Sequence, residues 1–206
     1  MVFLGFRFHL RVIGHGMLHC QRCGGDRLYQ ECAGRRWLQL LCIPVIPLDR
    51  VTEHVQCTIC GTRYRSEILR VPTTAQMQVA LPLATRAAAA AMLRAGDEHS
   101  CPARACAVEA IRRAGQDDYG DAALGTDLAD GEGAGDLAAR LRTLALQLTV
   151  PSHEWFLAAI VRVGLADGQL SAEERGAARQ IAAHLGMTPA QARGVISMME
   201  EAAAAG

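Results

Sequence analysis

The sequence of 206 residues has only nine aromatic residues and no lysine. Its 21 basic residues are therefore all arginine, a bias that we attribute to genome composition. Half of the residues are hydrophobic, and alanine accounts for much of that half. A chain rich in alanine and poor in aromatics is typical of a mostly helical protein with closely packed helices. The length allows one or two domains.

The sequence also lacks the common catalytic motifs. It contains no nucleophile elbow, P-loop, dinucleotide fingerprint or H-E-x-x-H pattern. The glycine-rich stretch 131–135 follows no expected strand and lacks the Lys-Ser/Thr of a P-loop, so we expect residues 126–136 to form a loop. We therefore expect a protein that is not an enzyme.

We expect neither a secretory leader nor a membrane-spanning segment. Residues 1–12 are apolar but contain Arg7 and Arg11, no A-x-A-like cleavage site follows them, and they are too few to span a bilayer. Apolar and polar residues alternate there with the period of a β-strand. We expect an N-terminal strand in a cytoplasmic protein, with contact to a membrane surface or a partner as the alternative.

Four of the eight cysteines form two C-x2-C pairs, Cys20 with Cys23 and Cys57 with Cys60. This spacing lets two thiolates from one turn bind a tetrahedral Zn²⁺, and the glycine after each pair suits a turn with positive φ. In a long chain without a leader, metal binding is favoured over disulfides. We predict a structural zinc, because four thiolates leave no ligand position for a catalytic water.

The other four cysteines, Cys32, Cys42, Cys101 and Cys106, have no such spacing. Cys42 lies in an apolar run and is expected in the core. Cys101 and Cys106 are five positions apart on an expected helix, which does not favour a shared face. A redox role for these thiols, or release of zinc on oxidation, is an open alternative.

Charge and pattern divide the chain into a β-rich part, residues 1–70, and a helical part, residues 73–206. The first part has ten arginines against five acidic residues, and the rest has the opposite imbalance. A basic N-terminal part permits contact with nucleic acid, although four zinc-bound thiolates would reduce its charge. The arginines that we single out for this contact are Arg22, Arg35, Arg36 and Arg63.

Helix signals are frequent after residue 73. Three capping boxes occur, at residues 73–76, 171–174 and 188–191. We expect Pro82 to begin a second helical segment, and residues 152–166, which are apolar nearly all round and include Trp155, to form a buried central helix. Residues 92–96 resemble 160–164, and 107–111 resemble 177–181, which indicates an internal repeat of two helical hairpins.

The acidic segment at residues 167–174 has two interpretations. It is not an EF-hand, because Val163 and Leu165 would occupy ligand positions. In the first interpretation, Asp167 and Gly168 form a turn and Glu174 closes a capping box. In the second, Asp167 and Glu174 bind a divalent cation together with Asp97.

Two segments resemble known families. The two cysteine pairs, with the run at 36–47 that ends in Ile-Pro-Val-Ile-Pro, resemble a bacterial zinc-ribbon family. Residues 163–174, with their Ala-Asp-Gly signature, and 185–188 resemble the TerB family of tellurite-resistance proteins. The TerB resemblance implies an all-helical domain with a duplicated core and a divalent-metal site at Asp167 and Glu174, although residues 95–100 lack the Asp-Gly of that signature.

Together these observations predict a small β-rich four-cysteine zinc ribbon over residues 1–70, followed by an all-α TerB-like domain over residues 73–206. The resemblances imply a non-enzymatic, stress-associated protein that acts through interaction or scaffolding. Its expected cofactor is structural Zn²⁺, with a second divalent cation in the helical domain as an addition. The expected partner is a protein, and nucleic acid is the alternative.

Overall fold

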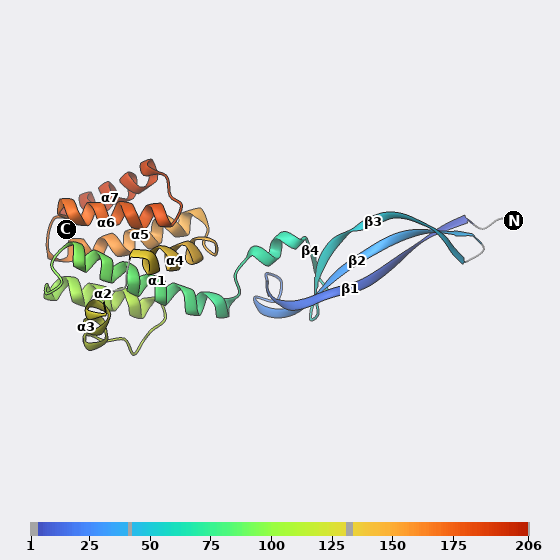
Figure 1. The fold of residues 1–206 in the computed structure, drawn as a ribbon, viewed down its shortest axis with the longest axis horizontal. Coiled ribbons are helices and arrows are strands. Elements are labelled where there is room, and N and C mark those ends of the chain that lie inside the picture. The colour runs from blue at the N-terminus through green and yellow to red at the C-terminus, as the bar shows by residue number, and fades with distance from the viewer. Residues whose placement is uncertain (1–3, 41–42, 131–133, 206) are drawn as a thin grey trace. The chain divides into compact units, whose positions relative to one another are not determined.

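The computed structural model describes residues 4–40, 43–130 and 134–205, and the side chains of residues 11–34, 53–130 and 136–205. The chain divides into two compact units, Met1–Gln76 and Met77–Gly206, and each is described by itself. A four-stranded antiparallel sheet is followed by seven α-helices in the described part of the chain (Figure 1). The prediction of a β-rich part followed by a helical part is therefore confirmed.

The first unit is built on three long strands, β1 (Leu4–Cys20), β2 (Gly25–Leu40) and β3 (Ile43–Cys57), and a short fourth, β4 (Arg63–Tyr64). They lie in the order β1-β2-β3-β4. In the register, Cys20 pairs with Gly25, and Tyr29 of β2 pairs with both Gly16 and Cys57. The carboxyl ends of β1 and β3 therefore meet at one end of the sheet.

The hydrophobic core at this end of the sheet is small. Among the described side chains, Leu18, Cys20, Val55 and Cys57 are buried, and Tyr29, Tyr64 and Ile68 pack against them. The last of these lies in a 3₁₀ helix, Ser66–Arg70. The buried side chains described at this end of the sheet surround the cysteines, so a metal ion held there would add a cross-link to this cluster.

The second region contains helices α1 to α7 and a 3₁₀ turn, Leu165–Asp167. The bounds of the helices are α1 Thr74–Ala95, α2 Cys101–Arg113, α3 Asp121–Ala129, α4 Ala134–Ala145, α5 Val150–Gly164, α6 Ala172–His184 and α7 Pro189–Ala204. Helix α5 contacts α2, α6 and α7. Its residues Phe156, Leu157 and Ile160 are buried in the core, as expected for a central helix.

The three predicted capping boxes are present. At α1, the Thr73 N–H donates to Gln76 Oε1 at 3.0 Å, and the Gln76 N–H donates to Thr73 Oγ1 at 3.3 Å. The boxes of α6, between Ser171 and Glu174, and of α7, at Thr188, have both reciprocal bonds. Each box satisfies N–H groups that a helix leaves without an internal partner.

Three expectations for this region are wrong. Pro82 does not begin a helix but lies buried inside α1, whose first turns it interrupts by one backbone hydrogen bond without ending the helix. The loop expected at 126–136 is shorter, because α3 continues to Ala129 and α4 begins at Ala134. Trp155 is not buried: it is 67% exposed at the surface of α5.

An ion pair and hydrogen bonds link helix α3 to α1. Arg86 of α1 forms an ion pair with Asp127, and the Tyr119 hydroxyl also donates to Asp127. The Arg86 guanidinium lies over the Tyr119 ring, 5.2 Å from its centre. Burial on its own would raise the pKa of Asp127, but the hydrogen bonds from Arg86 and Tyr119 outweigh it and hold that pKa below its usual value.

This network predicts a pH-dependent contribution to stability. The substitution Asp127→Asn should lower the unfolding free energy of the helical unit by roughly 1–2 kcal/mol at pH 7, since it removes a charged acceptor that is mostly buried. The folded-state pKa is depressed, so this contribution is present above the unfolded pKa of about 3.9 and is lost as the pH falls through the folded value. In thermal melts followed at 222 nm, the midpoint of Asp127→Asn should therefore lie below that of the wild type at pH 7, and the two midpoints should converge near pH 2. Asp118→Asn, at an exposed carboxylate, is the control, and an equal loss at both pH values would contradict the prediction.

Candidate metal centre

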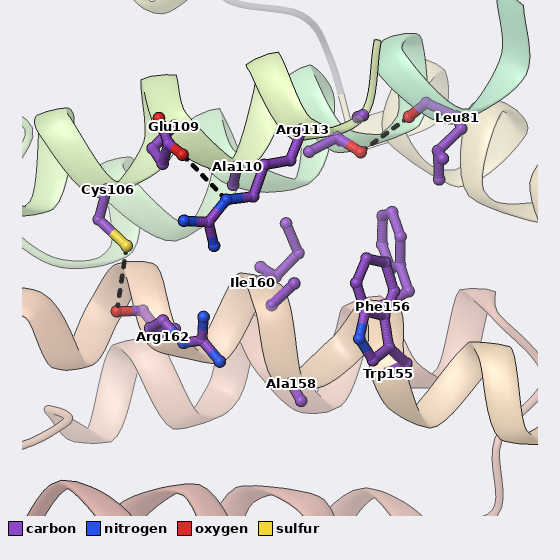
Figure 2. A pocket seen from close by; sticks show the side chains of 13 residues that line it. Leu81, Cys106, Glu109, Ala110, Arg113, Trp155, Phe156, Ala158, Ile160 and Arg162 are labelled. Atoms are coloured by element: carbon purple, nitrogen blue, oxygen red, sulfur yellow. Dashed lines mark hydrogen bonds and ion pairs between the residues drawn. The ribbon is translucent and has the colours of Figure 1, made fainter. Parts of the chain in front are cut away.

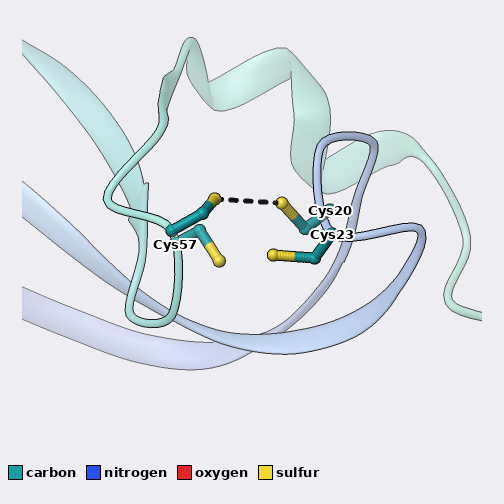
Figure 3. Close-up of side chains that lie close together, drawn as sticks. Cys20, Cys23 and Cys57 are labelled. Carbon is teal, nitrogen blue, oxygen red and sulfur yellow. Dashed lines mark hydrogen bonds between the residues drawn. The ribbon is translucent and has the colours of Figure 1, made fainter.

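Four cysteines gather at the end of the sheet where β1 and β3 finish. Their Sγ atoms, those of Cys20, Cys23, Cys57 and Cys60, all lie within 4.8 Å of one another, close enough to hold a metal ion. Cys20 Sγ and Cys60 Sγ are 3.6 Å apart, near the separation of about 3.8 Å that two thiolates have on a tetrahedral zinc with 2.3 Å bonds. Figure 3 shows Cys20, Cys23 and Cys57 pointing toward a common space.

Two similar turns place these sulfurs. The Gly24 N–H donates to Cys20 O at 2.9 Å, and the Gly61 N–H donates to Cys57 O at 3.0 Å. Both glycines have positive φ, 66° and 68°, a conformation that glycine adopts without steric cost. The glycine requirement predicted for each pair is met. Because the register of β1, β2 and β3 brings the two turns together, the pairs lie side by side although they are far apart in the sequence.

The pKa values of three cysteines in this cluster are shifted in different directions. The Tyr64 hydroxyl, 3.2 Å from Cys20 Sγ, lowers the pKa of Cys20 to about 6. Burial raises the pKa of Cys23 to about 12, while the Thr62 hydroxyl, 3.1 Å from Cys60 Sγ, lowers the pKa of Cys60. Four close thiols cannot all ionise without a cation. A bound divalent metal would supply that charge, and the protons would be released to solvent.

The donor set determines what such a metal can do. Four thiolates form a closed tetrahedral sphere, so no position remains for water or substrate. Tyr64 and Thr62 can donate hydrogen bonds to the ligating sulfurs and so orient them. Neither residue was predicted from the sequence, although their places two and four positions after Cys60 are a signal for them.

Asp26 is a further residue that the sequence analysis did not single out. Its Oδ1 accepts a hydrogen bond from the Thr74 N–H at 3.0 Å, and its Oδ2 accepts one from the Ala75 N–H at 3.2 Å. His19 Nδ1 lies 3.2 Å from the same carboxylate. The Thr74 N–H is the main cause of a lowered Asp26 pKa. A residue three positions after Cys23 thus satisfies the first N–H groups of α1, and all these contacts lie within the first unit.

The residues of the predicted second cation site are not brought together. Among the described residues, the four cysteines are the only group of three or more such ligands within 4.8 Å of one another, so Asp97, Asp167 and Glu174 form no such group. Glu174 is 6% exposed, and its Oε2 accepts the Ser171 N–H at 2.7 Å as part of the capping box. Asp97 Oδ1 accepts the His99 N–H at 2.9 Å.

Glu174 instead lies where the two aligned repeat segments end. A Cβ atom added to Gly96 would be 2.3 Å from Glu174 Oε1, and one added to Gly164 would be 3.2 Å from the same atom. Met92 Sδ is also close to the Gly164 position, at 3.3 Å. The glycines that the repeat alignment places in equivalent positions therefore both make room for this one buried carboxylate.

The arginines singled out for nucleic acid fall into two groups. Arg22 and Arg63 are exposed in and beside the cysteine turns, and Arg22 Nη1 donates to Thr62 Oγ1 at 3.5 Å. The side chains of Arg35 and Arg36 lie outside the described residues.

The remaining cysteines are dispersed. Cys32 is buried in β2, Cys101 is exposed at the start of α2, and Cys106 is half-buried in the same helix. Cys42 lies outside the described residues. Among the described cysteines, none of these three belongs to the metal-binding group.

The fold and the site define a class: an antiparallel sheet that carries a four-cysteine cluster able to hold a metal ion, followed by a helical unit. A scan of protein-family models and searches of curated proteins and of solved structures found no match to the chain. In the part of the chain that the structure describes, no helix has both the length and the apolar character needed to cross a membrane.

Proposed function

We propose that this chain is a zinc-binding, non-enzymatic interaction protein of the reducing cytoplasm. The observation that carries the proposal is the convergence of Cys20, Cys23, Cys57 and Cys60 within 4.8 Å. Four soft thiolates in tetrahedral reach favour Zn²⁺ over hard cations, and a closed sphere assigns the ion a structural role. The sheet of the first unit then corresponds to a zinc ribbon.

The helical unit is proposed to be TerB-like, with a role in a stress response. The support is its Ala166-Asp167-Gly168 turn, followed by the Ser171 capping box, and the meeting of Gly96 and Gly164 at Glu174. Glu174 acts in this proposal as a cap and a packing residue. The low solvent exposure of its carboxylate and its bond to Ser171 support that role over cation binding.

Exposed apolar side chains on the sheet support interaction with a protein partner. Met17 of β1 and Leu28 of β2 are paired in the register and are 54% and 58% exposed. Val12 and Ile13 of β1 are also largely exposed. Apolar side chains grouped on a sheet surface are typical of a surface that another molecule covers.

The test has two parts. Elemental analysis of the purified full chain should give one zinc per chain, and less than about half an equivalent would contradict the ribbon, since four thiolates should saturate. Cross-linking in the native cell should then capture a partner with the wild type but not with a Met17→Thr, Leu28→Thr double variant that retains zinc. Ile59→Thr, at an exposed apolar residue between the second cysteine pair, is the control. Salt-dependent binding to DNA or RNA that is lost with Arg22→Gln and Arg63→Gln would instead favour a nucleic-acid partner.

A further inference from the structure

The helical unit contains a cavity of about 260 Å³ whose lining includes neither the four cysteines nor the exposed apolar residues of the sheet. Figure 2 shows it between α2 and α5, with Leu81 of α1 also on its wall. Its apolar wall includes Leu81, Ala110, Phe156 and Ile160. Trp155, which the sequence analysis placed in the core, also lines it and is 67% exposed. This exposure gives a large aromatic side chain access to whatever occupies the cavity.

Two guanidinium groups face the same space. Arg113 of α2 donates through Nε to Glu109 Oε1 at 2.9 Å, so its charge is paired. Arg162 of α5 has no hydrogen-bond or ion-pair partner for its side chain among the described residues. The neighbouring Cys106 thiol stays neutral, because burial raises its pKa. The lining of the cavity therefore has one positive charge in excess.

The polar and apolar parts of the cavity lie at opposite ends. In Figure 2, Cys106 and Arg162 lie at one end, and Leu81, Trp155 and Phe156 lie at the other, with Ile160 between them. A ligand that fits this arrangement has a charged end and an apolar end. The sign of the free charge requires the ligand's charged end to be negative.

We infer that the cavity binds a single alkyl chain with an anionic head group, with the head at Arg162 and the chain against Phe156 and Leu81. The volume is near the lower limit of small-molecule sites, roughly 300–1,000 Å³, which favours one chain of medium length over a bulky ligand. A docked protein would bury a wider surface, on the order of 800 Å² per partner. The small, partly enclosed cavity, with the exposed Arg162 at its polar end, favours the small ligand.

The experiment titrates the zinc-loaded full chain with monomeric decanoate by calorimetry. A parallel titration follows the fluorescence of Trp155 in a Trp37→Phe background, since these are the two tryptophans of the chain. We expect saturable binding at one site, a change in Trp155 emission, and weaker binding of decanol and of decyltrimethylammonium. Arg162→Gln should weaken decanoate binding about tenfold, the effect of one hydrogen bond to a charged group.

Two further variants keep the test decisive. Ala110→Leu should fill the apolar part of the cavity and abolish binding, with circular dichroism showing that the helices are intact. Arg179→Gln changes an exposed arginine of α6 that does not line the cavity, and it should leave binding unchanged.

Several results would overturn the inference. These are no saturable decanoate binding to the folded wild type, equal binding of decanol, or binding that survives both Arg162→Gln and Ala110→Leu. Decyl phosphate and phosphatidylglycerol vesicles both present an anionic phosphate group with alkyl chains. Comparing the two distinguishes binding of a free monomeric ligand from binding to a lipid head group in a membrane. Binding to vesicles without binding to monomeric decanoate or decyl phosphate would assign Trp155 to a membrane surface and exclude the cavity site.

Discussion

Replacing Cys20 with serine should abolish stoichiometric zinc binding and unfold the sheet around Leu18 and Val55. The reason is that the buried side chains described around the cysteines form a small cluster, whereas a structural metal site commonly supplies roughly 10–16 kcal/mol of apparent folding free energy. The α-helical signal at 222 nm should remain, because the helical unit has its own core. Zinc content after dialysis against a chelator and hydrogen exchange of the Gly24 and Gly61 amides measure the two effects.

Cys32→Ala is the matched control for this substitution. Cys32 is buried in β2 of the same sheet but does not belong to the metal-binding group. The variant should keep one zinc per chain and the protection of both glycine amides. A Cys20→Ser protein that kept full zinc and a protected sheet would show that the other three cysteines suffice, contrary to a four-thiolate site.

Substituting alanine for Gly96 should destabilise the helical unit by about 2–3 kcal/mol, the upper range for overpacking a core. The new Cβ would lie 2.3 Å from Glu174 Oε1, and the capping box prevents that carboxylate from moving freely. Gly164→Ala should have a similar effect, because its Cβ would lie 2.6 Å from Leu170 Cδ2. Denaturant unfolding followed by far-UV circular dichroism measures both changes.

Gly194→Ala provides the contrast, since no atom lies within 4 Å of the added Cβ and the residue is inside α7. It should stabilise the protein by about 0.5–1 kcal/mol, the usual gain of alanine over glycine in a helix. A double-mutant cycle tests whether Glu174 is the group that clashes with the new Cβ. In a Glu174→Ala background, Gly96→Ala should lower the unfolding free energy far less than it does in the wild type. Equal penalties in both backgrounds would mean that Glu174 is not the group that excludes a side chain at Gly96.

The sequence predicted best those features that depend on neighbours in the chain. The C-x2-C pairs, their glycines and the capping boxes each lie within a few residues, so spacing alone reveals them. Trp155 was misplaced because its exposure depends on how the helices pack, and Pro82 is not a helix start, because α1 runs through it. The hydrophobic pattern of α5 indicates an all-round apolar helix, but the side of it that carries Trp155 is 67% exposed at that residue.

The predicted sites divide in the same way. The cysteine cluster follows from the motif, whereas whether Asp97, Asp167 and Glu174 form a ligand group depends on how α1, α5 and α6 pack, and among the described residues they form none. Asp26 carries no motif at all. Its role arises only because the start of β2 lies beside the residues that begin α1, a long-range contact that sequence spacing does not encode.

The position of Asp26 makes the beginning of the longest helix depend on the metal turn. Asp26, whose carboxylate accepts the Thr74 and Ala75 N–H groups, is the second residue of β2 and lies three residues after Cys23, so the strand that leaves the first cysteine turn also caps the helix. When the metal leaves and this turn loses its shape, the first donors of α1 lose their acceptor and the helix frays from its start. The order of the first turn of α1, which lies within the first unit, should therefore follow the occupancy of the metal site.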